Sequence, residues 1–250
     1  MRTVAAALLL MTSVSSRAIS GDEHWDNQFG WPGPGQVTDS IAVHNGRIYT
    51  SGAGSTTTNV ALIVWDGWQW SPEAQFIGPS TVIVYDLAFI GDTLYAAGNF
   101  TNVNGITAGG LAKWDGVNWT TVNNFKGTIT CLTVDGANLY ASGIFTNPAA
   151  GGAIATNIAY WDGSSWNALG NGLGSVSGSS VRATAVKNGQ VYAAGTFTNS
   201  GPQLVTNVAV WNGSTWSAVG GGISGFGVSS LTFNGNDLYA GGAFSQAGST

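Results

Sequence analysis

The sequence predicts an all-β protein, a β-propeller made of four-stranded antiparallel blades. Three features predict it: a tryptophan element that recurs at long intervals, a tyrosine element that recurs in step with it, and glycine-rich turns between short apolar segments. The tryptophan elements begin at Trp65, Trp114, Trp161 and Trp211, at spacings of 49, 47 and 50 residues. A period of this length is typical of propellers and other repeat arrays.

The composition fits many short strands and tight turns. Of 250 residues, 44% are hydrophobic and 11% aromatic, so the chain can bury a large core. There are 38 glycines but only 6 prolines, as expected for numerous turns. Only 8% of the residues are charged, which leaves few groups for acid–base chemistry.

The tyrosine element marks the second strand of each repeat unit. The segments "IYTSG", "LYAAG", "LYASG", "VYAAG" and "LYAGG" place Tyr49, Tyr95, Tyr140, Tyr192 and Tyr239 in register. A first strand precedes each one, separated by a tight turn such as "HNGR" or "DGAN", in which glycine beside Asn or Asp supplies a positive φ. A longer "FTN" loop leads to the third strand, which ends in tryptophan. The unit is therefore predicted to be a four-stranded meander.

Side-chain sizes indicate how these units pack. In the first strands, bulky residues (Val43, Phe89, Val134, Val186, Phe233) alternate with small ones (Ala42, Ala88, Thr133, Ala185, Thr232). Such strands suit sheets that are buried on both faces, as in propeller blades. We expect the tryptophan pairs to fill the space between adjacent blades.

The Asp-Gly turn between the two tryptophans has a predicted structural role. Its Asp is expected to accept hydrogen bonds from nearby backbone N–H groups. Asn212 replaces Asp in one copy, which fits this role because an amide oxygen can accept the same bonds.

The N-terminus is typical of a secreted or cell-surface protein. Residues 1–20 contain Arg2, an apolar run from Val4 to Met11, and small residues near Ser20, which predict a cleaved signal peptide. The apolar run is too short for an ordinary transmembrane helix, so no membrane insertion is expected. After cleavage, five basic residues (7 − 2) face twelve acidic ones, a net charge of −7 that disfavours nucleic-acid partners. Cys131 has no partner for an internal disulfide and is expected to be a small buried residue.

The repeat predicts a propeller domain over residues 21–250. Its blades span 37–80, 81–127, 128–180 and 181–227, and residues 228–250 supply two strands of a further blade. Residues 21–36, which contain Trp25 and Trp31, resemble outer strands and can complete that blade, giving five. In the alternative, the chain is cut from a longer propeller whose further blades follow Thr250. We expect a monomer in either case.

The order "LYAAGNF…GLAKWDGVNWTTV" resembles the kelch-type repeat. It is more similar still to secreted bacterial repeat proteins, and to fungal cortical polarity markers, with units "LYAGGxF…IAxWDGxxWxxLGxG". The resemblance covers residues 37–250 and implies a propeller, an architecture that hosts many functions. WD repeats carry an upstream Gly-His that is missing here, and sialidase Asp boxes space Asp and Gly differently. Copper oxidases of the kelch-type fold need His ligands, yet only His24 and His44 are present.

Candidate functional residues are sought where the repeat varies, because one reaction or binding site needs an asymmetric set of groups. No nucleophile, cofactor or metal motif is recognised. Asp39, Tyr85 and Arg182 occupy matching places where first strands begin, and Asp86 is adjacent. The "FTN" loops add amides that suit sugar hydroxyls or a Ca²⁺ shell, or that serve only as turn residues. These amides belong to Asn102, Asn104, Asn147 and Asn199.

Three function classes remain open from sequence. The first is a non-catalytic recognition or scaffold propeller for a protein or glycan ligand. The second is a lectin-like carbohydrate-binding module. The third, which is least favoured, is a polysaccharide hydrolase or lyase in which Asp39 and Asp86 would supply the carboxylates.

Overall fold

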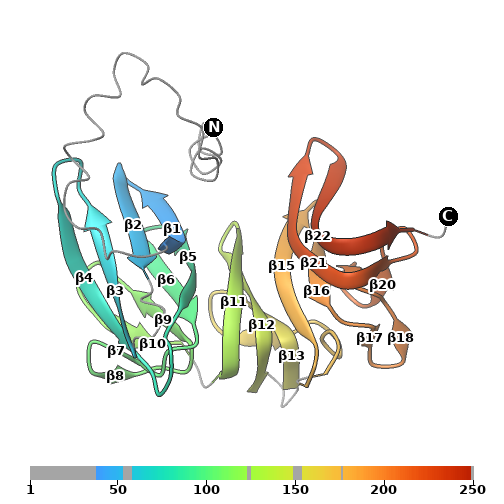
Figure 1. Cartoon of the computed structure of the whole chain (residues 1–250), viewed down its shortest axis with the longest axis horizontal. Helices are drawn as coiled ribbons and strands as arrows, with labels where there is room; N and C mark the ends of the chain where they lie inside the picture. The colour runs from blue at the N-terminus through green and yellow to red at the C-terminus, as the bar shows by residue number, and fades with distance from the viewer. Residues whose placement is uncertain (1–37, 53–57, 123–124, 149–153, 176, 249–250) are drawn as a thin grey trace. The chain divides into compact units, whose positions relative to one another are not determined.

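Every regular element in the described part of the protein is a β-strand, as the computed structural model shows (Figure 1). The structure describes residues 38–52, 58–122, 125–148, 154–175 and 177–248. The predicted signal peptide and residues 21–36 lie outside these ranges. The strands form successive antiparallel sheets, which confirms the predicted fold class of a β-propeller built from four-stranded blades.

Each of the first four sheets contains a four-stranded meander. Blade 1 consists of β1 (Thr38–His44), β2 (Arg47–Gly52), β3 (Asn59–Trp65) and β4 (Trp70–Ile77). Blade 2 consists of β5 (Val84–Ile90), β6 (Thr93–Gly98), β9 (Leu111–Trp114) and β10 (Trp119–Thr121). Blade 3 consists of β11 (Lys126–Asp135), β12 (Asn138–Pro148), β13 (Ile154–Trp161) and β14 (Trp166–Ala168). Blade 4 consists of β15 (Ser180–Lys187), β16 (Gln190–Thr196), β19 (Val208–Trp211) and β20 (Trp216–Ala218).

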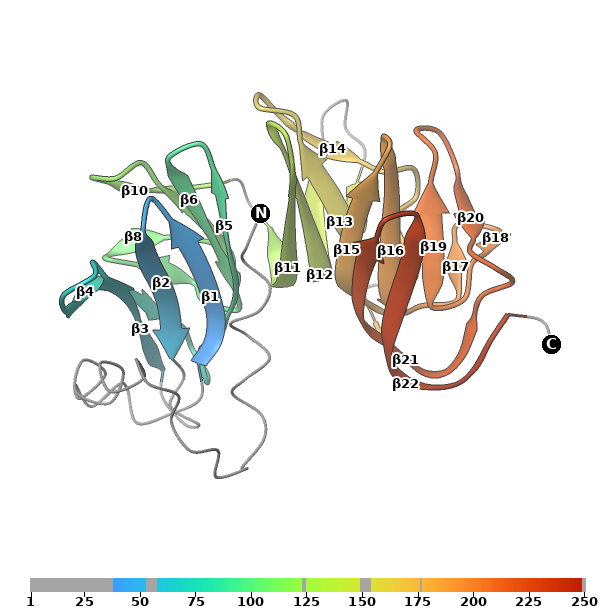
Figure 2. The same cartoon turned by 90° about the horizontal axis from the view of Figure 1, so that it is seen from above.

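Two strands of a fifth unit follow. They are β21 (Ile223–Asn234) and β22 (Asp237–Ala247), which form a long curved hairpin (Figure 2). Tyr239 of β22 is 53% exposed, whereas the equivalent Tyr95 and Tyr140 are 7% and 8% exposed. The difference arises because Tyr95 and Tyr140 pack against the following blade, whereas no following unit covers this face of β22 among the described residues.

The "FTN" segments of blades 2 and 4 contain short hairpins where a plain loop was expected. These are β7 (Asn102–Val103) with β8 (Ile106–Thr107), and β17 (Asn199–Ser200) with β18 (Gln203–Leu204). The first hairpin pairs with β4, so blade 2 extends the outer edge of blade 1. The blade junction is thus held by backbone hydrogen bonds as well as by side chains.

The tryptophan pairs lie directly opposite one another on the third and fourth strands. The paired residues are Trp65 with Trp70, Trp114 with Trp119, Trp161 with Trp166, and Trp211 with Trp216. Their ring centroids are 5.6 to 6.4 Å apart. Trp119, Trp166 and Trp216 are at most 4% exposed, which confirms their predicted place in the core.

Alternation along the second strands divides each blade between two junctions. In β6, Leu94 and Ala96 pack toward blade 1, whereas Tyr95 and Ala97 pack toward blade 3. This division follows from the two-residue period of a strand. Aromatic contacts then cross the junctions: Tyr49 meets Phe89 edge-on at 5.0 Å, and Tyr192 meets Phe233 in the same way at 5.0 Å.

The Asp-Gly turns have the predicted hydrogen bonds. In blade 2, Oδ1 of Asp115 accepts from the N–H groups of Val117 and Asn118, at 2.9 and 2.7 Å. Asp66 and Asp162 make the same bonds, and Asn212 accepts from Ser214 and Thr215 at 3.0 and 2.9 Å. These backbone bonds hold the pKa of Asp66, Asp115 and Asp162 below the usual Asp range.

Replacement of Asp115 tests whether this turn needs a charge or only an acceptor. Asp115→Ala is expected to lower the melting temperature, because two turn N–H groups lose their acceptor. Asp115→Asn is expected to stay close to the wild type, since Asn212 makes the same bonds in blade 4. Thermal unfolding followed by circular dichroism measures both. An Asn variant as unstable as the Ala variant would contradict the acceptor role.

Candidate functional site

A β-bulge interrupts the first strand in all five units, within the first three residues of β1, β5 and β15 and near the middle of the longer β11 and β21. The ladder between first and second strands shifts register by one residue at each of these places. The extra residues, called the bulge residues below, are Asp39, Tyr85, Thr130, Arg182 and Ser229. Three of the sequence-predicted site residues thus share one structural position, at which the side chain differs from blade to blade. Bulges re-aim a side chain and are often found beside functional sites.

A glycine of the second strand makes room for each of four bulges. A Cβ on Gly98, Gly143 or Gly195 would lie 2.0 to 2.2 Å from a carbonyl oxygen of the bulged strand, and one on Gly242 would lie 2.6 Å away. No side chain fits at such distances. The glycine that ends each "YAAG" or "YASG" segment is therefore required by the bulge beside it.

Gly143→Ala tests this requirement. We expect a loss of stability of about 3 kcal/mol or more, because the clash is with backbone and cannot be relieved by a rotamer change. Gly116→Ala is the matched control, since Gly116 also gains a Cβ but has nothing within 4 Å and only a positive φ to strain. Urea unfolding compares the two variants. Equal destabilisation would show that the bulge does not depend on the close approach.

Asp39 and Tyr85 lie near each other across the junction of blades 1 and 2. Asp39 is exposed on β1, whereas Tyr85 is half-buried on β5. Burial, and secondarily the Asp39 carboxylate, raise the pKa of the Tyr85 phenol. Between the same blades, Oγ of Ser51 donates to the carbonyl of Val84 at 3.2 Å. Asp39 and Tyr85 thus place a carboxylate and a phenol next to each other at the junction of blades 1 and 2.

Asp86 links blade 2 to blade 3. Its Oδ1 accepts from the N–H of Leu87 at 2.9 Å, and its Oδ2 accepts from the N–H of Leu132 at 2.7 Å. The second bond satisfies a backbone donor on the edge of β11 that does not pair with β12. Burial outweighs both bonds and raises the pKa of Asp86 to about 6. Burial, followed by the Asp86 carboxylate, also raises the pKa of the partly buried Cys131 thiol, which stays protonated.

The raised pKa of Asp86 makes stability depend on pH in a defined window. The folded protein keeps the proton from about pH 4 to about pH 6, whereas the unfolded chain releases it. The free energy of unfolding therefore falls as the pH rises through this window, by up to about 3 kcal/mol. Asp86→Asn removes this dependence. Urea unfolding at pH 4, 5, 6 and 7 measures the free energy of unfolding of both proteins. The variant should gain stability relative to wild type as the pH rises. A difference that stays constant with pH would contradict the raised pKa of Asp86.

The amides of the "FTN" segments are engaged within the fold. Oδ1 of Asn102 accepts from the N–H of Gly105 at 2.9 Å within its own turn. Asn104 has a φ of 46° and exchanges two bonds with the backbone of Gln75 in blade 1, at 2.8 and 3.0 Å. Asn199 donates to the carbonyl of Gly201 at 2.8 Å. Asn147 lies in β12 opposite Ala155, and its side chain is outside the described residues.

Two further asparagines emerge only from the structure. Asn157 and Asn207 are buried, at 0% and 5% exposure, and have φ values of 61° and 60°. Asn207 accepts from the N–H of Phe197 at 3.1 Å and donates to the carbonyl of Ile223 at 2.8 Å, which ties blade 4 to β21. Asn157 makes matching bonds to Phe145 and Leu173. The repeated "TNIA" and "TNVA" in the sequence were the available signal.

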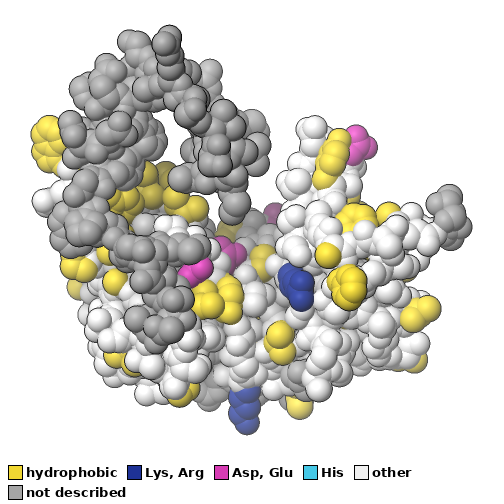
Figure 3. All heavy atoms as spheres, in the orientation of Figure 1, with side chains coloured by type: hydrophobic (Ala, Val, Ile, Leu, Met, Phe, Trp, Pro, Cys, Tyr) yellow, Lys and Arg dark blue, Asp and Glu magenta, His cyan; other side chains and the backbone are white. Residues whose placement is uncertain are grey.

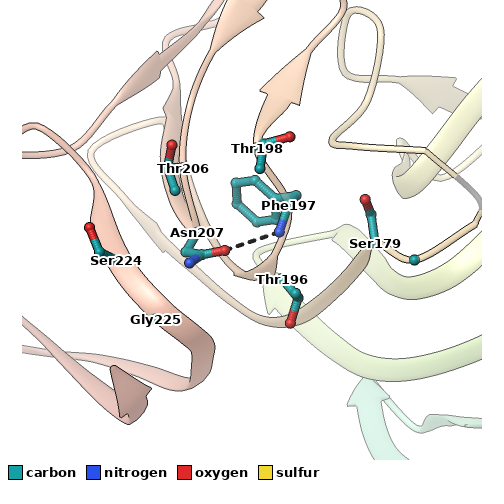
Figure 4. A pocket seen from close by; sticks show the side chains of 9 residues that line it. Ser179, Thr196, Phe197, Thr198, Thr206, Asn207, Ser224 and Gly225 are labelled. Carbon is teal, nitrogen blue, oxygen red and sulfur yellow. Dashed lines mark hydrogen bonds between the residues drawn. The ribbon is translucent and has the colours of Figure 1, made fainter. Parts of the chain in front are cut away.

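Arg182 is the sequence-predicted site residue that lines a cavity. A cavity of about 230 Å³ is lined by Arg182 together with Ile144 and Ser180. It adjoins a cavity of about 400 Å³ between blade 4 and β21, and the two share Gly178, Ser179 and Thr196 (Figure 4). The second volume lies within the range of ligand pockets. We call the two cavities together the groove.

The groove is lined by hydroxyl groups more than by charges. Ser179, Thr198, Thr206 and Ser224 surround it, and Asn207 forms part of its wall (Figure 4). Among the described residues, the side chains of Ser179, Thr206 and Ser224 have no hydrogen-bond partner, which leaves their donors and acceptors open to a ligand. The face of the molecule in Figure 3 likewise carries few charged side chains.

The described ranges contain neither a metal-binding cluster nor a membrane-spanning helix. No three His, Cys, Asp or Glu residues within them lie close enough together to bind a metal ion. The same ranges contain no helix with the length and apolar character needed to cross a membrane.

Comparison with known proteins gives weak structural likeness. No family model matches the sequence, and neither does any curated protein. Solved structures that resemble it include YjhT (16% identity, TM-score 0.39, covering 74% of this chain and 69% of that one). The designed Ika8 protein matches at 13% identity and TM-score 0.36, covering 82% and 68%. The WD40 β-propeller domain of Doa1 matches at 12% and 0.32, covering 84% and 93%. At these scores, the fold assignment depends on the strand pairing described above.

Proposed function

We propose that this protein is a kelch-like, non-catalytic recognition propeller that is secreted or displayed on the cell surface. It binds a protein or glycan ligand at the end of the blades where the first strands begin. One observation supports this most strongly: the five bulge residues occupy equivalent places but differ in chemistry, from acid to phenol, hydroxyl and guanidinium. A repeated scaffold that varies at one structural position, which is exposed or half-buried in every unit, suits selective binding.

The residues that recur across the repeat units have structural roles. The tryptophan pairs pack in the core, and the turn Asp residues bond to backbone N–H groups. Asp86 uses both carboxylate oxygens to accept backbone N–H bonds, one of them from the neighbouring blade. These engagements favour a binding role over the alternative of a hydrolase or lyase that uses Asp39 and Asp86.

A lectin-like function is the second candidate. The observation that favours it is the hydroxyl-lined groove beside Arg182, because hydroxyl and amide groups recognise the hydroxyls of sugars. In this case the ligand lies toward blades 4 and 5 rather than across all five bulges.

Binding to surface material tests the proposed function. Immobilised protein is incubated with a polysaccharide panel and with solubilised cell-surface proteins, and retained and released products are measured. We expect retention without turnover. The triple variant Asp39→Ala, Tyr85→Ala, Arg182→Ala should reduce retention about tenfold or more, whereas Asp237→Ala, at the opposite end of β22, should not. Polysaccharide cleavage that is abolished by Asp39→Asn or Asp86→Asn would overturn the non-catalytic assignment.

A further inference from the structure

Phe226 is an exposed aromatic residue that is adjacent in the chain to a residue lining the groove. Its side chain is 87% exposed, and it follows Gly225, which lines the larger cavity. The register of β21 shifts between Gly225 and Gly227, so Phe226 is itself the extra residue of a second bulge. Both glycines have positive φ, at 125° and 113°.

The first strands of blades 2 to 4 lack this arrangement. The position that matches Phe226 is taken by Val82 in blade 2, Gly127 in blade 3 and Ser179 in blade 4, and Val82 is fully buried. The fifth unit therefore departs from blades 2 to 4 at this position, where it holds a large apolar side chain in water. Leaving a Phe side chain exposed forgoes roughly 1.5–3 kcal/mol of burial energy. A single exposed apolar side chain is common on a protein surface, but Phe226 directly follows a residue that lines the larger cavity.

We infer that the groove binds a saccharide, with Phe226 stacking on the apolar C–H face of a sugar ring. Ser179, Thr206 and Ser224 offer open hydroxyls that can both donate to and accept from sugar hydroxyls. Nε of Arg182 donates to Oγ of Ser180 at 3.3 Å. The terminal amino groups of Arg182 have no hydrogen-bond partner within the described ranges and can donate to a sugar hydroxyl or carboxylate. Thr198 adds a further hydroxyl to the lining, which donates to Oδ1 of Asn199 at 3.3 Å.

Charge and shape favour a saccharide over other ligands. Apart from Arg182, the residues that line the groove are uncharged, so it lacks the basic cluster that phosphate-rich ligands need. The groove is open at the surface and combines apolar lining with hydroxyls that lie at several places around it instead of at one anchoring point (Figure 4). That distribution matches a chain of hydroxyl-bearing rings better than a compact apolar ligand.

This inference deepens the proposed recognition function and is tested with defined probes. Fluorescently labelled cello-, chito- and galacturono-oligosaccharides are titrated against the full chain, and dissociation constants are measured. We expect binding of at least one probe, weakened about tenfold or more by Phe226→Ala and by Thr206→Val. Arg182→Gln should weaken galacturonide binding more than neutral binding if a carboxylate lies beside Arg182.

Trp68→Ala is the matched control. Trp68 is 83% exposed, but it lies in the Asp-Gly turn at the opposite end of blade 1 from the bulges. Its removal should leave saccharide binding unchanged, which separates stacking at the groove from adhesion to any exposed aromatic. Circular dichroism of each variant confirms folding.

The outcomes separate the inference from the proposed function. Saccharide binding that is lost in the groove variants and kept in Trp68→Ala supports the inference. Saccharide binding that survives all groove variants overturns this site but leaves a recognition propeller. Retention of surface proteins without binding to any saccharide probe overturns the inference and keeps the broader function. Retention of neither overturns both.

Discussion

The packing of each blade against the next is the constraint on which the rest of the structure depends. A four-stranded meander has two apolar faces and cannot bury both alone, so neighbouring sheets must cover them. Four separate clusters of buried side chains accomplish this, one at each junction between successive units. Truncation of a buried tryptophan typically costs roughly 3–5 kcal/mol, far more than a surface turn contributes. The tryptophan pairs therefore dominate the energetics of the repeat.

Because the blade junctions are well packed, one residue at the bulge of each first strand can differ between blades. The bulge places one residue of each first strand out of the ladder, and the glycine opposite it makes the geometry possible. Since the bulge is held by backbone contacts, the bulge residue itself can change without disturbing the fold. The same reasoning explains why Asp86 differs from its neighbours: its carboxylate satisfies a backbone donor of the next blade at the expense of a raised pKa.

The sequence predicted the parts of the molecule that repeat. Two markers with one period established the meander, and the alternation around Tyr95 established which faces are buried. The replacement of Asp by Asn212 even predicted the acceptor role of the Asp side chain in the turn.

Features that break the period were harder to foresee. The hairpin that contains Asn104 pairs with another blade, and such a long-range contact leaves no local pattern. The bulges were equally hidden, although their positions coincide with Asp39, Tyr85 and Arg182, because register shifts depend on both strands of a ladder. Phe226 was missed because a single exposed aromatic residue in a strand has the same sequence appearance as a buried one.

A double-mutant cycle across one blade junction tests the central claim most directly. Phe76 of blade 1 meets Trp119 of blade 2 edge-on, with ring centroids 5.4 Å apart. Phe76→Leu, Trp119→Phe and the double variant are compared with wild type by urea unfolding. The account predicts a coupling energy of about 0.5–1.5 kcal/mol between the two positions. Effects that add to within about 0.3 kcal/mol would show that the two rings do not interact, and would contradict the packing of these blades against each other.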